Sequence, residues 1–98
     1  MRRAARTDAN HVEIINAFRA LGCSVQDLSA VGRGVPDIIV GHRGANYLVE
    51  IKDGSKHPSA RRLTSDQVTW HNAWRGQNCV IKSVDEVVGF LNKITKKN

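Results

Sequence analysis

Two apolar segments in the middle of the chain, 35–42 (VPDIIVGH) and 46–52 (NYLVEIK), constrain the fold most strongly. Both are rich in residues typical of strands. Arg43-Gly44 between them suits a tight hairpin turn, because glycine tolerates the positive φ that such turns require. Apolar side chains occur on both faces of these strands, so both faces should be covered by other elements. We therefore predict a hairpin in the middle of a sheet, with helices on both sides.

Three other segments have the spacing of amphipathic helices. The first begins at Asp8, a predicted N-cap, and stops at Gly22. The second and third each begin with a capping box, in which a hydroxyl side chain and a side chain three residues later bond reciprocally to the backbone. These boxes are Thr64 with Gln67, which opens a helix running to about Trp74, and Ser83 with Glu86.

Two shorter segments, 23–29 and 78–83, are each expected to add one strand. The predicted order of elements is α, β, β, β, α, β, α. This order gives an α/β fold, a three-layer sandwich around a central mixed four-stranded sheet. We expect one domain over residues 1–98, with basic ends at 1–7 and 95–98 that are frayed.

The chain carries 15 Lys and Arg against 9 Asp and Glu, a net charge of +6. Nucleic acid is the first partner to consider, although many domains are basic for solubility alone. Cys23 and Cys79 lie apart without a metal-ligand spacing, which favours free thiols in a reducing compartment. No segment approaches the roughly 18 apolar residues of a membrane helix, so we expect a cytoplasmic protein, bacterial or phage-encoded. The four histidines show no ligand spacing and are expected on the surface: His11, His42, His57 and His71.

Two carboxylates interrupt the apolar hairpin. If Arg43-Gly44 form a two-residue turn, Asp37 lies directly opposite Glu50, with Cβ atoms roughly 4.5–5.5 Å apart. Like charges at this distance repel, and each disfavours ionisation of the other. A shared proton, nearby cations or a hard divalent metal such as Mg²⁺ can relieve the repulsion. The alternative is a pair at the sheet edge that points into water. Lys52, on the same face as Glu50, adds an ammonium that could orient a water or stabilise charge on a phosphate.

Gly34-Val35-Pro36-Asp37, followed by Glu50-Ile51-Lys52, resembles the signature of the PD-(D/E)XK nuclease superfamily. The form RGVPDIIV…VEIK is most similar to its VRR-Nuc branch. The resemblance implies a restriction-endonuclease-like fold and a metal-dependent phosphodiesterase that uses Mg²⁺, with Mn²⁺ able to substitute. It implies that the metal ligands are Asp37, Glu50, the Ile51 carbonyl and Glu13, with Lys52 at the attacking water and Gln67 as a further catalytic residue.

Two of these residues have ordinary structural interpretations. Glu13 lies beside the apolar stripe of the first helix, so it could equally be a solvated glutamate. Gln67 could merely close the capping box with Thr64, and both roles could hold at once. Basic residues of the loops are expected to contact DNA phosphates, although charged loops are often only solvated: Arg33, Lys56, Arg61 and Arg62.

The expected function is that of a metal-dependent DNA endonuclease, specific for four-way (Holliday) junctions and acting as a homodimer. Resolution of a junction needs two symmetric cuts, and a two-fold dimer supplies two sites. The large apolar side chains that could serve a dimer interface, or simply the core, are Trp70, Trp74, Val88 and Phe90. The alternatives are a monomeric repair or nicking nuclease and a non-catalytic nucleic-acid binding module. Asp37, Glu50 and Lys52 are all present, which favours a catalytic protein.

Overall fold

The computed structural model describes residues 7–96 of the 98-residue chain. Its centre is one four-stranded sheet in the order β1-β2-β3-β4. The strands are β1 Ser24–Asp27, β2 Ile38–His42, β3 Ala45–Ile51 and β4 Asn78–Ile81. The first three strands pair antiparallel, and β4 pairs parallel to β3. The predicted mixed sheet is confirmed.

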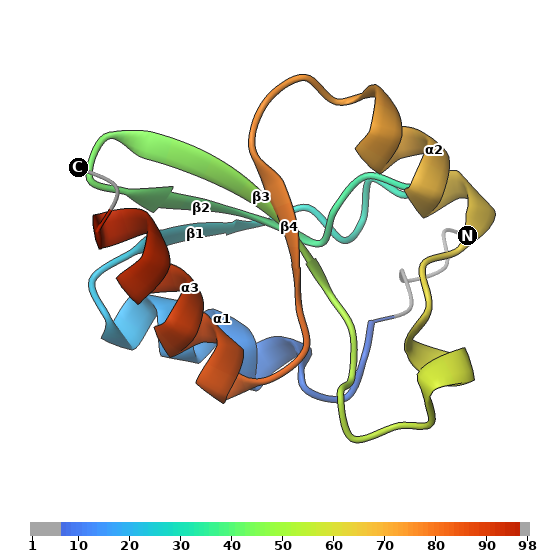
Figure 1. The fold of residues 1–98 in the computed structure, drawn as a ribbon, viewed down its shortest axis with the longest axis horizontal. Coiled ribbons are helices and arrows are strands. Elements are labelled where there is room, and N and C mark those ends of the chain that lie inside the picture. Colours follow the sequence, from blue (N-terminus) through green and yellow to red (C-terminus); the bar gives the residue numbers. More distant parts are fainter. Residues whose placement is uncertain (1–6, 97–98) are drawn as a thin grey trace.

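Helices lie on both sides of this sheet. They are α1 His11–Ala20, α2 Ser65–Ala73 and α3 Val84–Lys96, and a short 3₁₀ helix, η1 Pro58–Arg61, precedes α2. α1 and α3 pack together on one face, whereas α2 lies on the other side, over one end of the sheet (Figure 1). The predicted three-layer α/β arrangement and its αβββαβα order are therefore confirmed. None of the helices described is long and apolar enough to cross a membrane.

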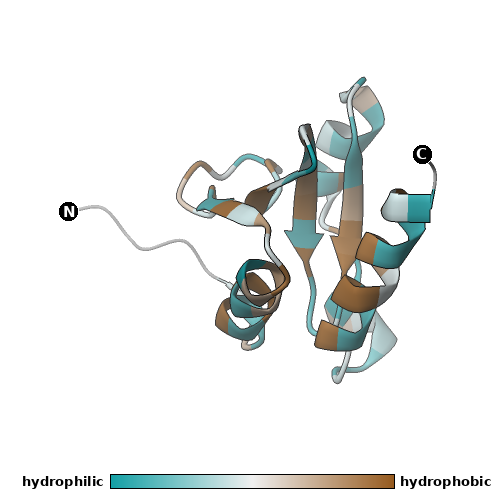
Figure 2. Cartoon of the chain, turned by 90° about the vertical axis from the view of Figure 1, so that its left-hand side faces the viewer, coloured by the Kyte–Doolittle hydropathy of each residue, from teal (hydrophilic) through white to brown (hydrophobic). Residues whose placement is uncertain are grey.

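The apolar core lies between the sheet and the layer of α1 and α3. Strands and helices both contribute apolar residues to it (Figure 2). The alternation of β2 and β3 turns Ile38, Val40, Val49 and Ile51 toward this core, as expected for strands of period two. Its fully buried members from the sheet and helices include Ile38, Val40, Val49, Ile14, Phe18 and Val87. The residues between these positions on the strands face the side where α2 lies.

The hairpin has the predicted register. Ile38 pairs with Val49 and His42 with Ala45. Arg43 and Gly44 both have positive φ, 50° and 82°, which is the geometry of a type I′ turn. The two-residue turn is confirmed, and Asp37 lies just before the first paired residue of β2.

The start of α1 differs from the prediction. Asn10, not Asp8, is the N-cap residue, and Asp8 contributes only its backbone carbonyl, which accepts from the His11 N–H at 3.0 Å. The Asn10 side chain is turned to the sheet, where its amide donates to the carbonyls of Lys52 and Lys82 at 3.2 and 3.0 Å. Asn10 therefore joins the ends of β3 and β4 to the first turn of α1.

The start and the end of α3 also differ from the prediction. Ser83 Oγ accepts from the Glu86 N–H at 3.2 Å, but the Glu86 carboxylate accepts from the Lys82 N–H at 2.7 Å, so the capping box is only half formed. Thr95 and Lys96 continue α3 instead of fraying. The other expected frayed residues, except residue 7, lie outside the described part of the chain.

Candidate active site

The ladder between β2 and β3 stops where Asp37 begins. Continued by one more pair on the same face, its register would set Pro36 opposite Ile51. Proline has no N–H, so Pro36 cannot donate to the Ile51 carbonyl. The Ile51 N–H instead donates to Oδ2 of Asp37 at 2.8 Å. At this end of the hairpin the Asp37 carboxylate is therefore hydrogen-bonded to β3, and the Ile51 carbonyl has no partner in the β2–β3 ladder.

Glu50 lies beside Asp37 and is only 2% exposed. Its Oε2 accepts from the side-chain amide of Gln67 at 3.0 Å, whereas its buried Oε1 has no hydrogen-bond partner within residues 7–96. Burial, together with the neighbouring Asp37 carboxyl group, raises the pKa of the Glu50 carboxyl to about 9. Without a cation, Glu50 therefore keeps its proton at neutral pH. The predicted proximity of the two carboxyl groups is confirmed.

The side-chain amide of Gln67 both caps α2 and contacts Glu50. The Gln67 Oε1 accepts from the backbone N–H of Thr64 at 2.9 Å, and the backbone N–H of Gln67 donates to Thr64 Oγ1 at 3.3 Å. The capping box is therefore complete. The Gln67 Nε2 is thereby turned to Glu50. The capping box is confirmed, and the same geometry positions Gln67 against a carboxylate.

Gly34 allows the loop before β2 to pack closely on the start of α2. Gly34 has φ +84°, and a Cβ on it would collide with the backbone carbonyl of Asp66 in the first turn of α2. A glycine is required here for both reasons, since other residues rarely adopt this φ and none of them fits the space. The loop that enters β2 therefore packs directly on the first turn of the helix that carries Gln67.

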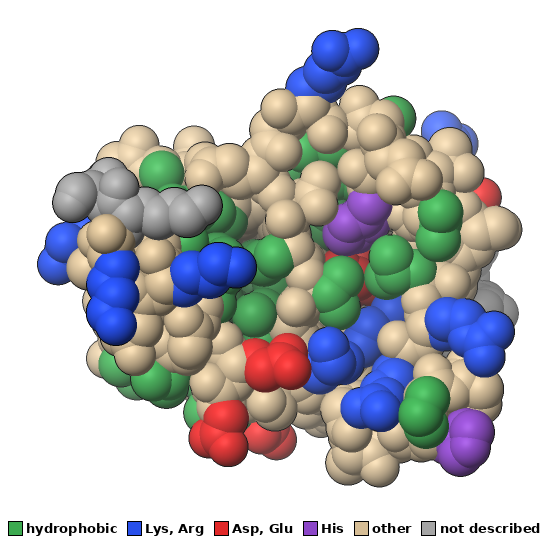
Figure 3. All heavy atoms as spheres, viewed as in Figure 1, with side chains coloured by type: hydrophobic (Ala, Val, Ile, Leu, Met, Phe, Trp, Pro, Cys, Tyr) green, Lys and Arg blue, Asp and Glu red, His purple; other side chains and the backbone are tan. Residues whose placement is uncertain are grey.

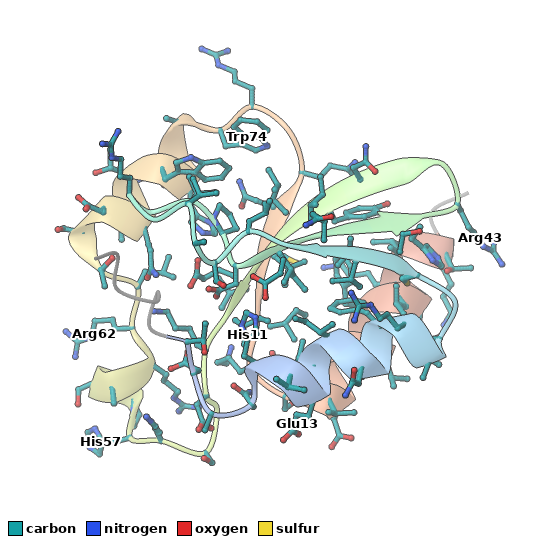
Figure 4. The ribbon with its side chains drawn as sticks, turned by 180° about the vertical axis from the view of Figure 1, so that it is seen from behind. His11, Glu13, Arg43, His57, Arg62 and Trp74 are labelled. Carbon is teal, nitrogen blue, oxygen red and sulfur yellow. The ribbon has the colours of Figure 1, made fainter. Side chains whose placement is uncertain are left out.

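Asp8 is a third carboxylate near the pair, and sequence reasoning missed it. Its charge contributes to the raised pKa of Glu50. Glu13, predicted as a ligand, is exposed and lines a separate pocket with Asn10, Asp53 and other residues. Figure 4 shows Glu13 directed outward from α1. The structure does not bring Glu13 to the pair, because the apolar stripe of α1 turns Ile14, not Glu13, inward.

Lys52 follows Glu50 by two residues and is only 9% exposed. Its charge lowers the pKa of Glu50 and so acts against the effects of burial and of Asp37. The ammonium therefore lies close enough to the carboxyl pair for a direct electrostatic interaction, as predicted from the alternation of the strand.

The basic residues predicted to contact DNA divide into two kinds. Arg33, Lys56 and Arg62 are exposed, and Figure 4 shows Arg62 pointing away from the protein. Arg61 is half-buried and donates to the Gly54 carbonyl at 3.1 Å, so it braces the loop after β3. Lys and Arg side chains gather over the segment between β3 and α2 (Figure 3). The contacts of these residues with DNA stay predictions.

The histidines are less exposed than predicted. His11 is buried at the first position of α1, and its Nε2 lies 3.1 Å from the Asp27 carboxylate. His42 and His71 are half-buried and contact side chains of neighbouring elements, and only His57 is exposed. The surface prediction is therefore wrong for His11, because this residue pairs with the end of β1, which is distant in sequence.

The donor set at the end of the hairpin fits a magnesium-like ion. Among residues 7–96, no three side chains of His, Cys, Asp or Glu form a group that could hold a metal. Mg²⁺, however, usually keeps several waters and takes only one or two carboxylates from the protein. Asp37, Glu50 with an Oε1 that has no partner within residues 7–96, and the Ile51 carbonyl, to which Pro36 cannot donate, match this requirement.

Three features define the restriction-endonuclease-like class of nuclease domains, and this chain has all of them. They are a mixed sheet with helices on both faces, an Asp at the entry to β2 and a Glu-x-Lys at the end of β3. Comparison with solved structures gives a match described as a "VRR_NUC domain", with a TM-score of 0.63 and 30% sequence identity, covering 84% of this chain and 89% of that one. No family model and no curated protein matches the chain. The chain belongs to the VRR-Nuc family.

Proposed function

We propose that this VRR-Nuc domain is an endonuclease that hydrolyses DNA phosphodiester bonds with the help of Mg²⁺, for which Mn²⁺ can substitute. Family membership supports a nuclease-type domain. The observation that carries the proposal is the buried Glu50 carboxyl beside Asp37, whose Oε1 has no hydrogen-bond partner within residues 7–96. A bound divalent cation would offset the cost of a charged Glu50 at this buried position.

The proposed roles follow from the geometry. Asp37, Glu50 and the Ile51 carbonyl would hold the ion, and the charge of Asp8 would add to the attraction for it. When bound, the cation supplies an activated water and stabilises the charge that develops on the phosphate. Lys52 would donate a hydrogen bond to the attacking water or to a phosphate oxygen. Gln67 is a positioning residue, since it fixes Glu50 through Oε2 and leaves Oε1 for a ligand.

The test of this proposal replaces one carboxylate at a time by its amide. Asp37→Asn and Glu50→Gln should each abolish cleavage of DNA in Mg²⁺, while DNA affinity at fixed salt stays close to that of the parent, because phosphate contacts from basic side chains supply most of the affinity. Gel assays of cleavage and anisotropy assays of binding measure the two effects.

Glu13→Gln is the matched control, since it removes an exposed carboxylate that does not lie in the pair. This variant should cut at the rate of the parent. Full activity of either amide variant would overturn the assignment. A parent that binds DNA but cuts none in Mg²⁺ or Mn²⁺ would identify a binding module instead.

We also propose that the substrate is branched DNA, four-way junctions above all, and that the working unit is a homodimer. The support is the symmetry of the reaction, in which two related cuts need two related sites. The apolar residues predicted for the interface do not form one surface. Phe90 of α3 packs edge-on against Tyr47 and Phe18 at centroid distances of 5.3 and 6.4 Å, whereas Trp70 and Trp74 belong to α2 on the other side of the sheet.

A further inference from the structure

Trp74, at the end of α2, presents an aromatic ring in a fixed position. The ring stacks on Trp70 with centroids 4.7 Å apart and planes inclined by 16°. The following loop packs against its edge, because a Cβ on Gly76 would lie 2.7 Å from the indole Nε1. Trp74 is nevertheless 46% exposed. Trp70 and the loop therefore hold the ring while much of it stays open to solvent.

A groove of about 540 Å³ lies beside this ring. Trp74, Gly76 and Gln77 line one side, and the hairpin lines the other with Ile39, Leu48 and residues 44–46. The walls are apolar at Ile39 and Leu48. Polar groups lie at the rim, where the Gln77 amide donates to the Asn46 carbonyl at 3.1 Å and Asn46 itself is exposed. Apolar walls with amides at the edge match a nucleobase, which has apolar faces and polar edges.

The groove shares a sheet face with the carboxylates. Leu48 precedes Glu50 by two residues and Ile39 follows Asp37 by two, so alternation places all four side chains on the same face. Two residues of a strand span roughly 7 Å. This is about twice the 3.4 Å rise per nucleotide of a DNA strand. The near wall of the groove, at Ile39 and Leu48, would therefore lie about two nucleotides from the bond held at Asp37 and Glu50, and the far wall, at residues 44–46, lies further away.

We propose that the groove receives an unpaired base of the DNA substrate, stacked on Trp74, a few nucleotides from the bond to be cut. The inference rests on the proposed nuclease function and names its substrate class. Stacking of a base on an aromatic side chain tolerates any base sequence, because every base has a π-face. A base inside a continuous duplex is not available for such a contact. The substrate is therefore DNA with an unpaired or easily unstacked base near the cut, as beside a branch point or in a single-stranded arm.

A second copy of the chain fits this groove less well than a base does. The other large apolar side chains that are exposed within residues 7–96 are scattered over α1, the loop before β2, α2 and α3: Val12, Leu21, Val31, Val68 and Val88. Stable protein interfaces bury roughly 800 Å² on each partner around a continuous centre. An isolated ring beside a narrow groove offers one stacking site and no such centre.

The experiment measures binding of short oligo-dT and of a fully paired duplex in EDTA, so that no cleavage is needed. The chain has two tryptophans, and in Trp70→Phe the fluorescence reports on Trp74 alone. We expect oligo-dT to quench this fluorescence and the duplex to quench it far less. Trp74→Leu should weaken binding of oligo-dT roughly tenfold, as loss of one stacked base predicts, and leave duplex affinity unchanged. Trp74→Phe should recover part of the loss.

Val68→Ala is the matched control, because Val68 is exposed on the same helix but does not line the groove. It should bind both DNAs like the parent. Absence of quenching, equal weakening for both DNAs, or a dimer that becomes a monomer in Trp74→Leu would each overturn the inference. Should Trp74→Leu fail to fold, quenching in Trp70→Phe still decides. A protein that cuts DNA but shows no quenching loses this inference alone, whereas one that is quenched but cuts nothing loses the proposed function.

Discussion

Burial of the Glu50 carboxyl makes the stability of the metal-free protein depend on pH. An ordinary glutamate has a pKa near 4.5, and in the folded protein burial and Asp37 raise the pKa of Glu50 to about 9. Between these two values the unfolded chain has released its proton while the folded chain keeps it. The folded state thus binds more protons in this window, so its stability falls as the pH rises.

We predict that the melting temperature in EDTA decreases from about pH 5 to about pH 9, and that Glu50→Gln flattens this decrease because the amide does not titrate. Thermal melts across this range, followed by circular dichroism, measure the effect. Glu13→Gln keeps an intact Asp37–Glu50 pair and should follow the parent. A slope in Glu50→Gln as steep as that of the parent would show that other groups cause it.

The positions of individual site residues were predictable from the sequence in two cases: where a local motif such as a helix cap fixes them, and where the register of the hairpin could be counted from its turn. Counting back along both strands from the turn at Arg43-Gly44 placed Asp37 beside Glu50. The spacing of Thr64 and Gln67 predicted the helix cap. Asp8 was beyond reach, because it lies in an irregular segment whose approach to Glu50 is set by tertiary packing. Its position before an amphipathic segment suggested an N-cap, which is a common role for aspartate.

At the scale of elements, the connection from β1 to β2 is under backbone constraint. Gly32, Arg33 and Gly34 are consecutive and have φ of 74°, 60° and 84°, all in the left-handed region. The two glycines differ in their surroundings, since a Cβ on Gly32 would meet nothing within 4 Å, whereas one on Gly34 would collide with Asp66. An alanine at Gly32 would therefore test backbone strain alone, whereas an alanine at Gly34 would test strain and packing together.

We predict that Gly32→Ala lowers the free energy of unfolding by about 1–2 kcal/mol, the cost of a left-handed alanine. Gly34→Ala carries the same strain and also pushes α2 outward, so its loss should be clearly larger. Because α2 carries Gln67, Gly34→Ala should also slow DNA cleavage more than Gly32→Ala does. Urea unfolding and cleavage rates measure the two effects. Equal losses of stability in both variants would contradict the packing of Gly34 on α2.

The elements themselves followed from the sequence to a large extent. The hairpin was predictable because period two and a turn with glycine are local signals, and the α2 cap was predictable for the same reason. The α3 cap was only half right, since Glu86 binds the Lys82 N–H, a choice between adjacent backbone groups that spacing does not distinguish. The segment after β3 gave no periodic signal for η1, which is a single short turn.

At the scale of the whole molecule, the proposed resolution of junctions depends on the number of chains in the working unit. A homodimer would carry twice the net charge of +6, which favours contact with several phosphate backbones at once. Its two sites would be related by the same two-fold axis as the cuts.

We predict that light scattering after size exclusion gives about twice the chain mass of 10.8 kDa. A mixed dimer with one Asp37→Asn subunit should nick a four-way junction once and fail to resolve it. The dimer of two parent chains, prepared in the same way, is the control. A monomer at micromolar concentration, or equal cutting of junctions and linear duplex, would favour the monomeric nicking or repair nuclease.

Pro36 lacks an amide hydrogen, and the ladder between β2 and β3 therefore ends beside the carboxylates. Any other amino acid at this position would bring an amide hydrogen to the strand, and that hydrogen could close one more rung with the Ile51 oxygen. The rung would then compete with any ion for the same oxygen. Proline removes this competition, so the Ile51 oxygen stays open to an ion beside Asp37 and Glu50.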